Sequence, residues 1–200
     1  PGAKPVSLQE EMDRVLPVVE RIANELDVVV SVDTSSAELM REATRLGAGL
    51  LNDVRALQGE NALESAAEAK LPVCLMHMQG EPEDMQKNPS YDRVTDDVYI
   101  FLAQRIQQCN QMGIPNNQIL VDPGFGFGKS LKHNYRLLAK LQVFKTLGVP
   151  ILVGVSRKSM IGAVLNDRPV EGRLAGSVAA AVVAAQNGAH IIRAHDVAET

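Results

Sequence analysis

Three segments of the sequence place side chains at a spacing that could do chemistry. The first begins at Asp122 and reads Asp-Pro-Gly-Phe-Gly-Phe-Gly-Lys-Ser. A phosphate-binding P-loop needs a glycine where this segment has Pro123, and a dinucleotide-binding loop needs a third glycine where it has Lys129. Neither nucleotide motif is therefore met. What remains is a carboxylate followed by a flexible loop with two phenylalanines, one of them Phe127, that could cover a flat ligand.

The other two segments could bind an anion. Ser156 and Lys158 are two residues apart after an apolar run, so they share a face while the chain is extended. Arg193 and His195 have the same spacing after the last apolar run, and together they offer two donors to one anion such as a phosphate. A solvated basic turn and a structural histidine are the alternatives, and the residues alone leave them open.

Acceptor groups follow the earlier apolar runs. Asp33 and Asn52 end successive runs, and with Asp122 they would provide two carboxylates and one amide. Such a set fits a heterocycle whose edge offers adjacent N–H donors, as a guanidine-like ring does, because an unmatched buried carboxylate is very costly. The alternative is that the Asp and Asn only tie down loops. Met76, next to His77, is expected to pack on the sheet or on a ligand plane rather than to bind a metal.

The elements that must position these groups are short β-branched runs alternating with helical patterns. We expect strands, nearly continuous in apolar residues as in a parallel sheet, at residues 28–32, 49–54, 73–77, 119–122, 151–155 and 191–193. We expect helices at residues 8–26, 36–46, 61–70, 91–112, 131–147 and 174–187. Ser7 and Glu10 predict a capping box at the first helix, and Pro17 should kink or divide that helix.

These strand–helix units indicate a parallel α/β fold, either an open doubly wound sheet or a closed TIM (β/α)8 barrel. The barrel is favoured because polar residues follow every strand, and in a barrel all strand ends converge on one mouth. A whole barrel takes about 250 residues. We therefore expect residues 1–200 to form a single barrel domain with about six units present, its first two strands and last helix missing.

Composition narrows the class of protein. The chain has 20 Lys and Arg against 24 Asp and Glu, with 46% apolar residues, which excludes a disordered acidic tail and argues against a basic nucleic-acid binder. Two cysteines are too few for a disulfide scaffold, and no apolar run is long enough for a membrane span. We expect a cytoplasmic protein. The small apolar stripe at residues 178–185 is expected to be buried on two sides, by the barrel and by a second subunit.

Taken together, the segments resemble the dihydropteroate synthases, the folate-pathway enzymes targeted by sulfonamides. Six segments carry the resemblance, in family order over essentially the whole chain: residues 31–34, 51–54, 76–78, 122–129, 155–159 and 193–196. The resemblance implies a transferase that joins 6-hydroxymethyl-7,8-dihydropterin diphosphate to p-aminobenzoate, giving 7,8-dihydropteroate and pyrophosphate. It also implies a homodimer, without nucleic-acid or membrane partners.

Carried over position by position, the resemblance implies a role for each candidate residue. Asp122 would accept from the amino and ring N–H groups of the pterin, while Asn52 and Asp33 would hold its other edge. Asp33 would also stabilise the positive charge that develops as pyrophosphate leaves. Met76 would contact the pterin ring, and Lys158 would lie near the pterin carbonyl. Arg193 and His195 would bind the diphosphate, and Phe127 and Ser159 would border p-aminobenzoate. Val54 and Gly126 would make further substrate contacts.

The resemblance further implies Mg²⁺ bound with the substrate diphosphate. Its protein ligand is expected to be an asparagine upstream of Pro1, so no residue of this chain is expected to bind the metal. One alternative is a methyltetrahydrofolate:corrinoid methyltransferase, a related pterin barrel that does not need the anion sites at Lys158 and Arg193. The other is a catalytically silent barrel that only binds a pterin or a partner.

Overall fold

A computed structural model of the protein describes residues 6–81 and 84–200. Their contacts form two compact units, which are described one at a time. The N-terminal unit consists of residues 6–76 and 103–120, and the C-terminal unit consists of the described residues of 77–102 together with 121–200. Strands and helices alternate along both, as the sequence predicts.

Parallel strands form the centre of the N-terminal unit. The strands are β1 (Ser31–Asp33), β2 (Leu50–Asp53), β3 (Val73–Met76) and β4 (Ile119–Asp122), adjacent in this order. β2 pairs in parallel with both β1 and β3, and the register places Asp33 opposite Asn52. Because parallel strands end on the same edge of a sheet, the polar residues that close β1 and β2 are neighbours there.

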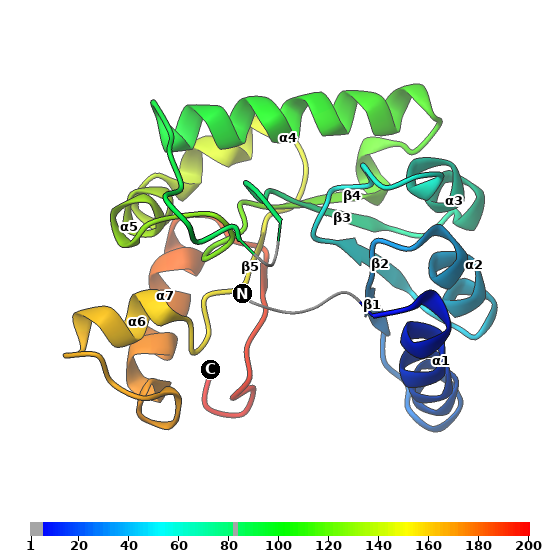
Figure 1. Ribbon diagram of the computed structural model, residues 1–200, viewed down its shortest axis with the longest axis horizontal. Helices are drawn as coiled ribbons and strands as arrows, with labels where there is room; N and C mark the ends of the chain where they lie inside the picture. Colours follow the sequence, from blue (N-terminus) through cyan, green and yellow to red (C-terminus); the bar gives the residue numbers. More distant parts are fainter. Residues whose placement is uncertain (1–5, 82–83) are drawn as a thin grey trace. The chain divides into compact units, whose positions relative to one another are not determined.

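Three helices cover these strands on one side (Figure 1): α1 (Leu8–Glu25), α2 (Ala37–Arg45) and α3 (Ala62–Ala69). The core between α1, β1 and α2 is built from small and β-branched side chains: Val19, Val30, Val32, Ala43 and Ala48. The Ser7 hydroxyl caps α1 by accepting from the Glu10 N–H at 3.2 Å, which is one of the two hydrogen bonds of the predicted capping box. Pro17 lies inside α1, which is one continuous helix, so of the two predicted effects, a kink or a division, the division is wrong.

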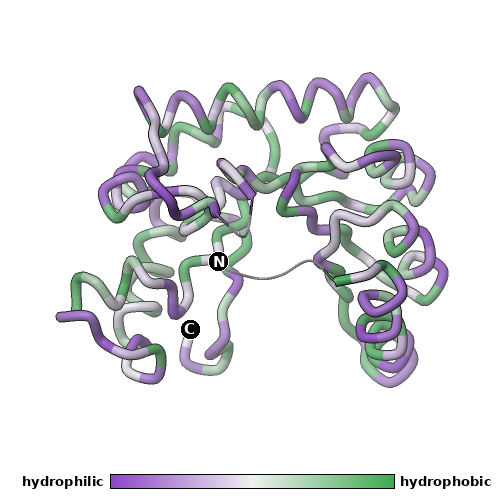
Figure 2. The backbone as a smooth tube through the Cα atoms, in the orientation of Figure 1, coloured by the Kyte–Doolittle hydropathy of each residue, from purple (hydrophilic) through white to green (hydrophobic). Residues whose placement is uncertain are grey.

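The C-terminal unit contains the parallel pair β5 (Leu152–Val153) and β6 (Ile191–Ile192), and Val121 of β4 bridges to Ile151 in parallel. Its helices are α4 (Val94–Gln111), which continues into the other unit, α5 (Leu131–Ala139), α6 (Ser159–Val164) and α7 (Leu174–Gln186). The core of this unit contains fully buried Leu137, Leu141, Phe144, Ile151 and Val153. Figure 2 shows polar and apolar residues alternating along α4, the pattern of a helix with one buried face.

Several element ends differ from the prediction. The helix expected at residues 131–147 ends at Ala139 and continues as the 3₁₀ helix Leu141–Leu147. Here the Thr146 hydroxyl binds the Val143 carbonyl at 2.8 Å, a local bond that competes with a regular helix. Two further 3₁₀ turns (Asn116–Gln118 and Val170–Gly172) and α6 were not predicted, since short segments carry little periodic signal.

One other expectation needs correction. The first strand was expected at residues 28–32 but spans Ser31–Asp33. Among the described residues before Ser31, the Val30 carbonyl is the acceptor for N–H groups next to β2, those of Gly49 and Leu50. Helix α7 buries Ser177, Ala181 and Ala184 and leaves Val182 and Val183 exposed, so one of its sides is buried within the chain, and burial of the other by a second subunit stays a prediction.

Within the described residues, no helix combines the length and apolar character needed to cross a membrane. Cys74 and Cys109 are buried free thiols.

Candidate active site

A buried carboxylate stands at the end of β4. Asp122 is 8% exposed, and its Oδ1 accepts from the Gly124 N–H at 2.7 Å. Burial raises the pKa of Asp122, while the nearby cations Lys158, Lys129 and Arg193 act to lower it. Gly124 has a φ of +72°, and a Cβ there would lie 1.9 Å from the His77 carbonyl oxygen, so this tight turn admits only glycine.

The Lys129 ammonium group fixes the loop that follows Asp122. Lys129 is 2% exposed, and its Nζ lies 2.9 Å from the Gly124 carbonyl, 3.0 Å from the Phe127 carbonyl and 3.2 Å from the His77 carbonyl. A fourth acceptor, His77 Nδ1, is 2.9 Å away. An ammonium group has three protons and no lone pair, so it can donate to three of these four acceptors at a time. The loop is therefore wrapped around a buried amine, and desolvation lowers the pKa of Lys129 to about 7 against the opposing effect of Asp122.

His77 enters the site as a neutral ring. Burial, together with the positive charge of Lys129, lowers the pKa of His77 to about 3. Its Nδ1 faces the ammonium group as an acceptor, so the ring proton is on Nε2. Phe101 packs edge-on against the imidazole with ring centroids 4.9 Å apart, and the His77 N–H donates to the Asp122 carbonyl at 3.0 Å. His77 thus ties the end of β3 to the end of β4.

Lys158 approaches the same loop from the turn before α6. Its Nζ donates to the Phe125 carbonyl and lies 4.7 Å from the centre of the Phe127 ring. Desolvation lowers the pKa of Lys158 to about 8, against the opposing effect of Asp122. Gly126 has a φ of +80°, and a Cβ there would be 3.3 Å from Lys158 Cδ, so glycine leaves room for the lysine stem.

The ends of β5 and β6 carry the predicted anion-binding groups. Arg193 is exposed, and its N–H donates to the Val153 carbonyl at 2.9 Å. The Ser156 hydroxyl accepts from the His195 N–H at 3.1 Å and lies 3.0 Å from His195 Nδ1, which orients the imidazole. Ser159, the first residue of α6, is exposed.

An ion pair holds these two strand-end loops together. Arg157 Nε donates to Asp196 Oδ2 at 2.9 Å, and a second nitrogen of the guanidinium binds Oδ1, which gives a bidentate pair. Arg157 has a φ of +56°, an uncommon conformation for a side chain of this size, and its N–H donates to the Ser177 hydroxyl at 2.9 Å. The turn that presents Ser156 and Lys158 is therefore held from both sides.

The N-terminal unit contains the other candidates. Asp33 closes β1 and is exposed, Asn52 opposite it is half-buried, and the Asn52 carbonyl accepts from the Thr34 N–H at 3.0 Å. Val54 follows β2 and is half-buried, whereas Met76 at the end of β3 is buried. Each stands at or just after the carboxyl end of its strand, where the sequence predicted it.

Two buried charges that the sequence analysis did not single out shape the loop after Asn52. Asp53 is fully buried and accepts from the N–H groups of Arg55 and Leu57, each at 2.8 Å, and from the Ser35 hydroxyl. Arg105 is 7% exposed and donates to the carbonyls of Ala56 at 2.7 Å and Leu57 at 3.0 Å. Ala56 and Leu57 both have positive φ, so this turn depends on the charged groups around it.

The structure thus brings Asp122, Gly126, Phe127, Lys158 and Arg193 into mutual contact or electrostatic range within the C-terminal unit. It pairs Asp33 with Asn52 in the N-terminal unit. No role is predicted from the sequence for Lys129, His77, Asp53 or Arg105. The available signal for Lys129 was its position immediately after a glycine-rich loop.

Comparison with known proteins identifies the family to which the chain is similar. Pterin binding enzymes match residues 1–195 of the chain. The chain is 56% identical over 200 residues to the dihydropteroate synthase of Escherichia coli strain K12, covering 100% of this chain and 71% of that protein. It is 54% identical over 200 residues to the Haemophilus influenzae dihydropteroate synthase, covering 100% of this chain and 72% of the relative.

Solved structures of dihydropteroate synthases are also similar to this chain. The Yersinia pestis dihydropteroate synthase in a sulfonamide drug complex matches with a TM-score of 0.98 at 55% identity, over 100% of this chain and 72% of the other. The Xanthomonas albilineans enzyme in complex with 7,8-dihydropteroate matches with a TM-score of 0.93 at 46% identity, over 100% and 73%. These likenesses confirm the predicted fold class, a TIM (β/α)8 barrel with about six of its units in this chain.

Replacing Lys129 with Met should lower the free energy of unfolding by about 1–3 kcal/mol, because it leaves buried carbonyls without a donor. Urea unfolding measures this change. Lys132→Met is the matched control, since Lys132 is exposed on α5 and its loss should leave the stability nearly unchanged. Equal stability of the two variants would show that the ammonium group does not hold the loop.

Stability should fall in acid because of His77. Its pKa is about 3 in the folded protein against 6.5 for a free imidazole, so the unfolded chain takes up a proton first as the pH falls. Between these values the native protein should lose up to about 1.4 kcal/mol per pH unit from this group. His77→Gln should flatten the curve by that amount. Parallel curves for His77→Gln and the unchanged protein would contradict this assignment.

Proposed function

Because the chain belongs to the family of pterin binding enzymes, we propose that its strand-end residues carry out the dihydropteroate synthase reaction in the roles given below. The protein is a transferase that condenses 6-hydroxymethyl-7,8-dihydropterin diphosphate with p-aminobenzoate, giving 7,8-dihydropteroate and pyrophosphate. The observation that carries the assignment of roles is the buried Asp122 carboxylate with Lys158 and Arg193 in electrostatic range. This site offers an acceptor for a heterocycle and cations for its leaving group.

Asp122 binds the amino and ring N–H groups of the pterin. One of its oxygens accepts from Gly124, and within the described residues no other hydrogen bond reaches this carboxylate. The second oxygen is then available to an N–H donor of the ligand. Binding is strong because the carboxylate is already desolvated, so the ligand replaces little water and gains charge-assisted hydrogen bonds.

Lys158 donates to the pterin carbonyl, and Phe127 and Ser159 border p-aminobenzoate. The ammonium group of Lys158 above the Phe127 ring supports this part of the proposal, since it joins a donor and an apolar wall in one place. Gly126 leaves the space in which the lysine stem runs and so shapes the substrate contact indirectly.

Arg193 and His195 receive the diphosphate. The Arg193 side chain is exposed, and the backbone and ring of His195 are oriented by Ser156, so both can turn donors toward an anion. The Arg157–Asp196 pair holds the loops that present them, which limits the reorganisation needed when the anion binds.

The family resemblance assigns the other edge of the pterin to Asn52 and Asp33, the ring to Met76 and a further substrate contact to Val54. Their support is the parallel register that pairs Asp33 with Asn52 and the place of each residue at a strand end. This part of the proposal rests on the strand ends and on the family resemblance.

The reaction is an ionising substitution. The bond from the pterin methylene carbon to the diphosphate oxygen breaks, and its electron pair leaves with pyrophosphate, whose charge Arg193 and His195 stabilise. The resulting cation is delocalised into the pterin, with Asp33 offsetting its charge. The amine nitrogen of p-aminobenzoate then attacks the methylene carbon and releases a proton. A weak nucleophile suffices because the electrophile is already a cation.

Mg²⁺ is expected to bind with the substrate diphosphate. Within residues 6–81 and 84–200, no three His, Cys, Asp or Glu side chains gather in a way that could hold a metal ion. The described residues do not fit a metal site of their own, and we derive no step through the ion. A homodimer and a cytoplasmic location stay predictions, the former supported by the exposed Val182 and Val183 of α7.

An assay of the reaction distinguishes this function from that of a catalytically silent pterin barrel. The full chain is incubated with pterin diphosphate and p-aminobenzoate, with and without Mg²⁺, and pyrophosphate release is followed by a coupled assay. We expect pyrophosphate and dihydropteroate to form in equal amounts in the presence of Mg²⁺. Pterin binding in calorimetry without any pyrophosphate release would contradict the proposed activity.

Asp122→Asn should weaken pterin binding by about 1–3 kcal/mol, because the amide places an N–H donor against the donors of the ring. Isothermal titration calorimetry with a pterin that lacks the diphosphate measures this loss without contributions from the anion-binding residues. Asp92→Asn, an exposed carboxylate of the same unit, is the control and should bind as the unchanged protein does. Unaltered affinity in Asp122→Asn would remove this residue from the pterin site.

A further inference from the structure

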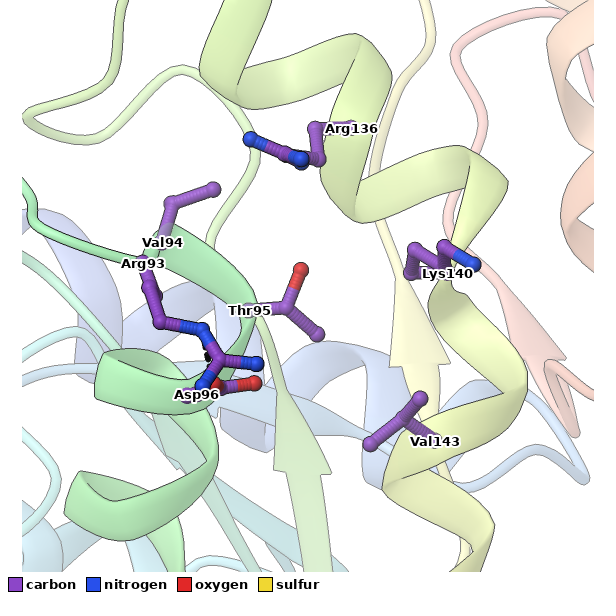
Figure 3. Close-up of a pocket in the computed structure, with 7 residues that line it drawn as sticks. All are labelled: Arg93, Val94, Thr95, Asp96, Arg136, Lys140 and Val143. Carbon is purple, nitrogen blue, oxygen red and sulfur yellow. Dashed lines mark ion pairs between the residues drawn. The ribbon is translucent and has the colours of Figure 1, made fainter.

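A pocket of about 270 Å³ lies between the start of α4 and the end of α5, in the C-terminal unit (Figure 3). None of its lining residues has a role in the proposed reaction. It is lined by Arg93, Val94, Thr95, Asp96, Arg136, Lys140 and Val143.

The Thr95 hydroxyl at this pocket has no protein partner. Thr95 is 9% exposed, and among the described residues its oxygen is buried without a hydrogen bond. Figure 3 shows this oxygen pointing into the space below Arg136. A buried hydroxyl without a partner carries a desolvation cost, which a ligand that accepts from it would offset.

Positive charge dominates the pocket lining. Arg136 and Lys140 are four residues apart at the end of α5, and in the described part of the chain neither forms an ion pair. Arg93 does form one, with its Nε 2.7 Å from Asp96 Oδ2. The lining therefore carries three cations against one carboxylate.

The start of helix α4 adds to the positive charge at the pocket. The helix is 18 residues long and begins at Val94 at the pocket. The N–H groups of Asp96 and Asp97 donate to the Arg93 carbonyl at 2.8 and 3.0 Å, so within the described residues the N–H groups of Val94 and Thr95 are the ones left for a ligand. The helix dipole favours an anion at this end. Asp96 and Asp97 in the first turn offset part of that effect, and Asp97 Oδ2 is already engaged with the Arg93 N–H at 3.1 Å.

We propose that this pocket binds a compact phosphate-class oxyanion. A tetrahedral anion has acceptor oxygens on all sides, so it can accept from the Thr95 hydroxyl, the Arg136 guanidinium and the start of α4 together, whereas a carboxylate accepts in one plane. Val94 and Val143 form apolar walls that limit its size, and the pocket is slightly below the roughly 300 Å³ at which pockets for organic ligands begin. The proposal does not depend on the reaction proposed above.

The test is a nitrogen-15 NMR titration of the full chain with inorganic phosphate at constant ionic strength. Phosphate can also bind at Arg193, so the titration is done in both the unchanged protein and Arg193→Gln. We expect saturable shifts of the Val94 and Thr95 amides in both. Thr95→Val and Arg136→Gln should each weaken this binding about tenfold, as loss of a hydrogen bond to a charged group does. Lys132→Gln, which removes one charge from the same helix outside the pocket, is the matched control.

Three results would overturn the proposal. The first is a titration in which the α4 amides do not saturate, or lose their response in Arg193→Gln. The second is an affinity that Thr95→Val and Arg136→Gln leave equal to that of Lys132→Gln. The third is acetate binding as tightly as phosphate, which would remove the argument from tetrahedral shape.

Discussion

The structure around the candidate active site depends on one electrostatic constraint, a carboxylate buried at the end of β4 that needs positive charge around it. Asp122 receives one backbone N–H, and the charges of Lys158, Lys129 and Arg193 all favour its ionised form. Burial raises the pKa of Asp122 and so favours the neutral acid, which is a poorer acceptor for a ring with N–H donors. Each cation also has a second task. Lys129 holds the loop, Lys158 stands over Phe127, and Arg193 is exposed, as its proposed contact with the diphosphate requires.

The same principle recurs at the end of β2. Asp53 and Arg105 are buried charges that bind backbone N–H and carbonyl groups rather than each other. They fix a turn containing two non-glycine residues of positive φ directly after Asn52. In both units, then, the residues expected to touch substrate sit on loops whose backbone is held by buried ions. Such loops need little reorganisation when a charged substrate binds, which is the condition for electrostatic stabilisation of a transition state.

Most of this arrangement could be predicted from polar residues at strand ends. Asp33, Asn52, Asp122 and Arg193 end or follow apolar runs, and the parallel register carries that pattern into space. Lys129 could not be placed in this way, because its partners are carbonyl groups that every residue has and no side-chain pattern reveals. The break after Ala139 and the short α6 were missed for a related reason, since local hydrogen bonds and single turns leave no periodicity. The pocket at Thr95 arises from α4 and α5 meeting, which the sequence of either helix alone does not show.

The most direct test of this account is to measure the pKa of Asp122 by a carbon-13 NMR titration of its carboxyl group. Lys129→Met and Lys158→Met each remove a charge that favours the carboxylate, so the titration of Asp122 should move to higher pH in both variants. Lys132→Met, which removes an exposed charge that is not among the groups acting on Asp122, should leave the titration where it is in the unchanged protein. A titration of Asp122 that is the same in all four proteins would contradict the claim that these cations lower the pKa of the buried carboxyl group.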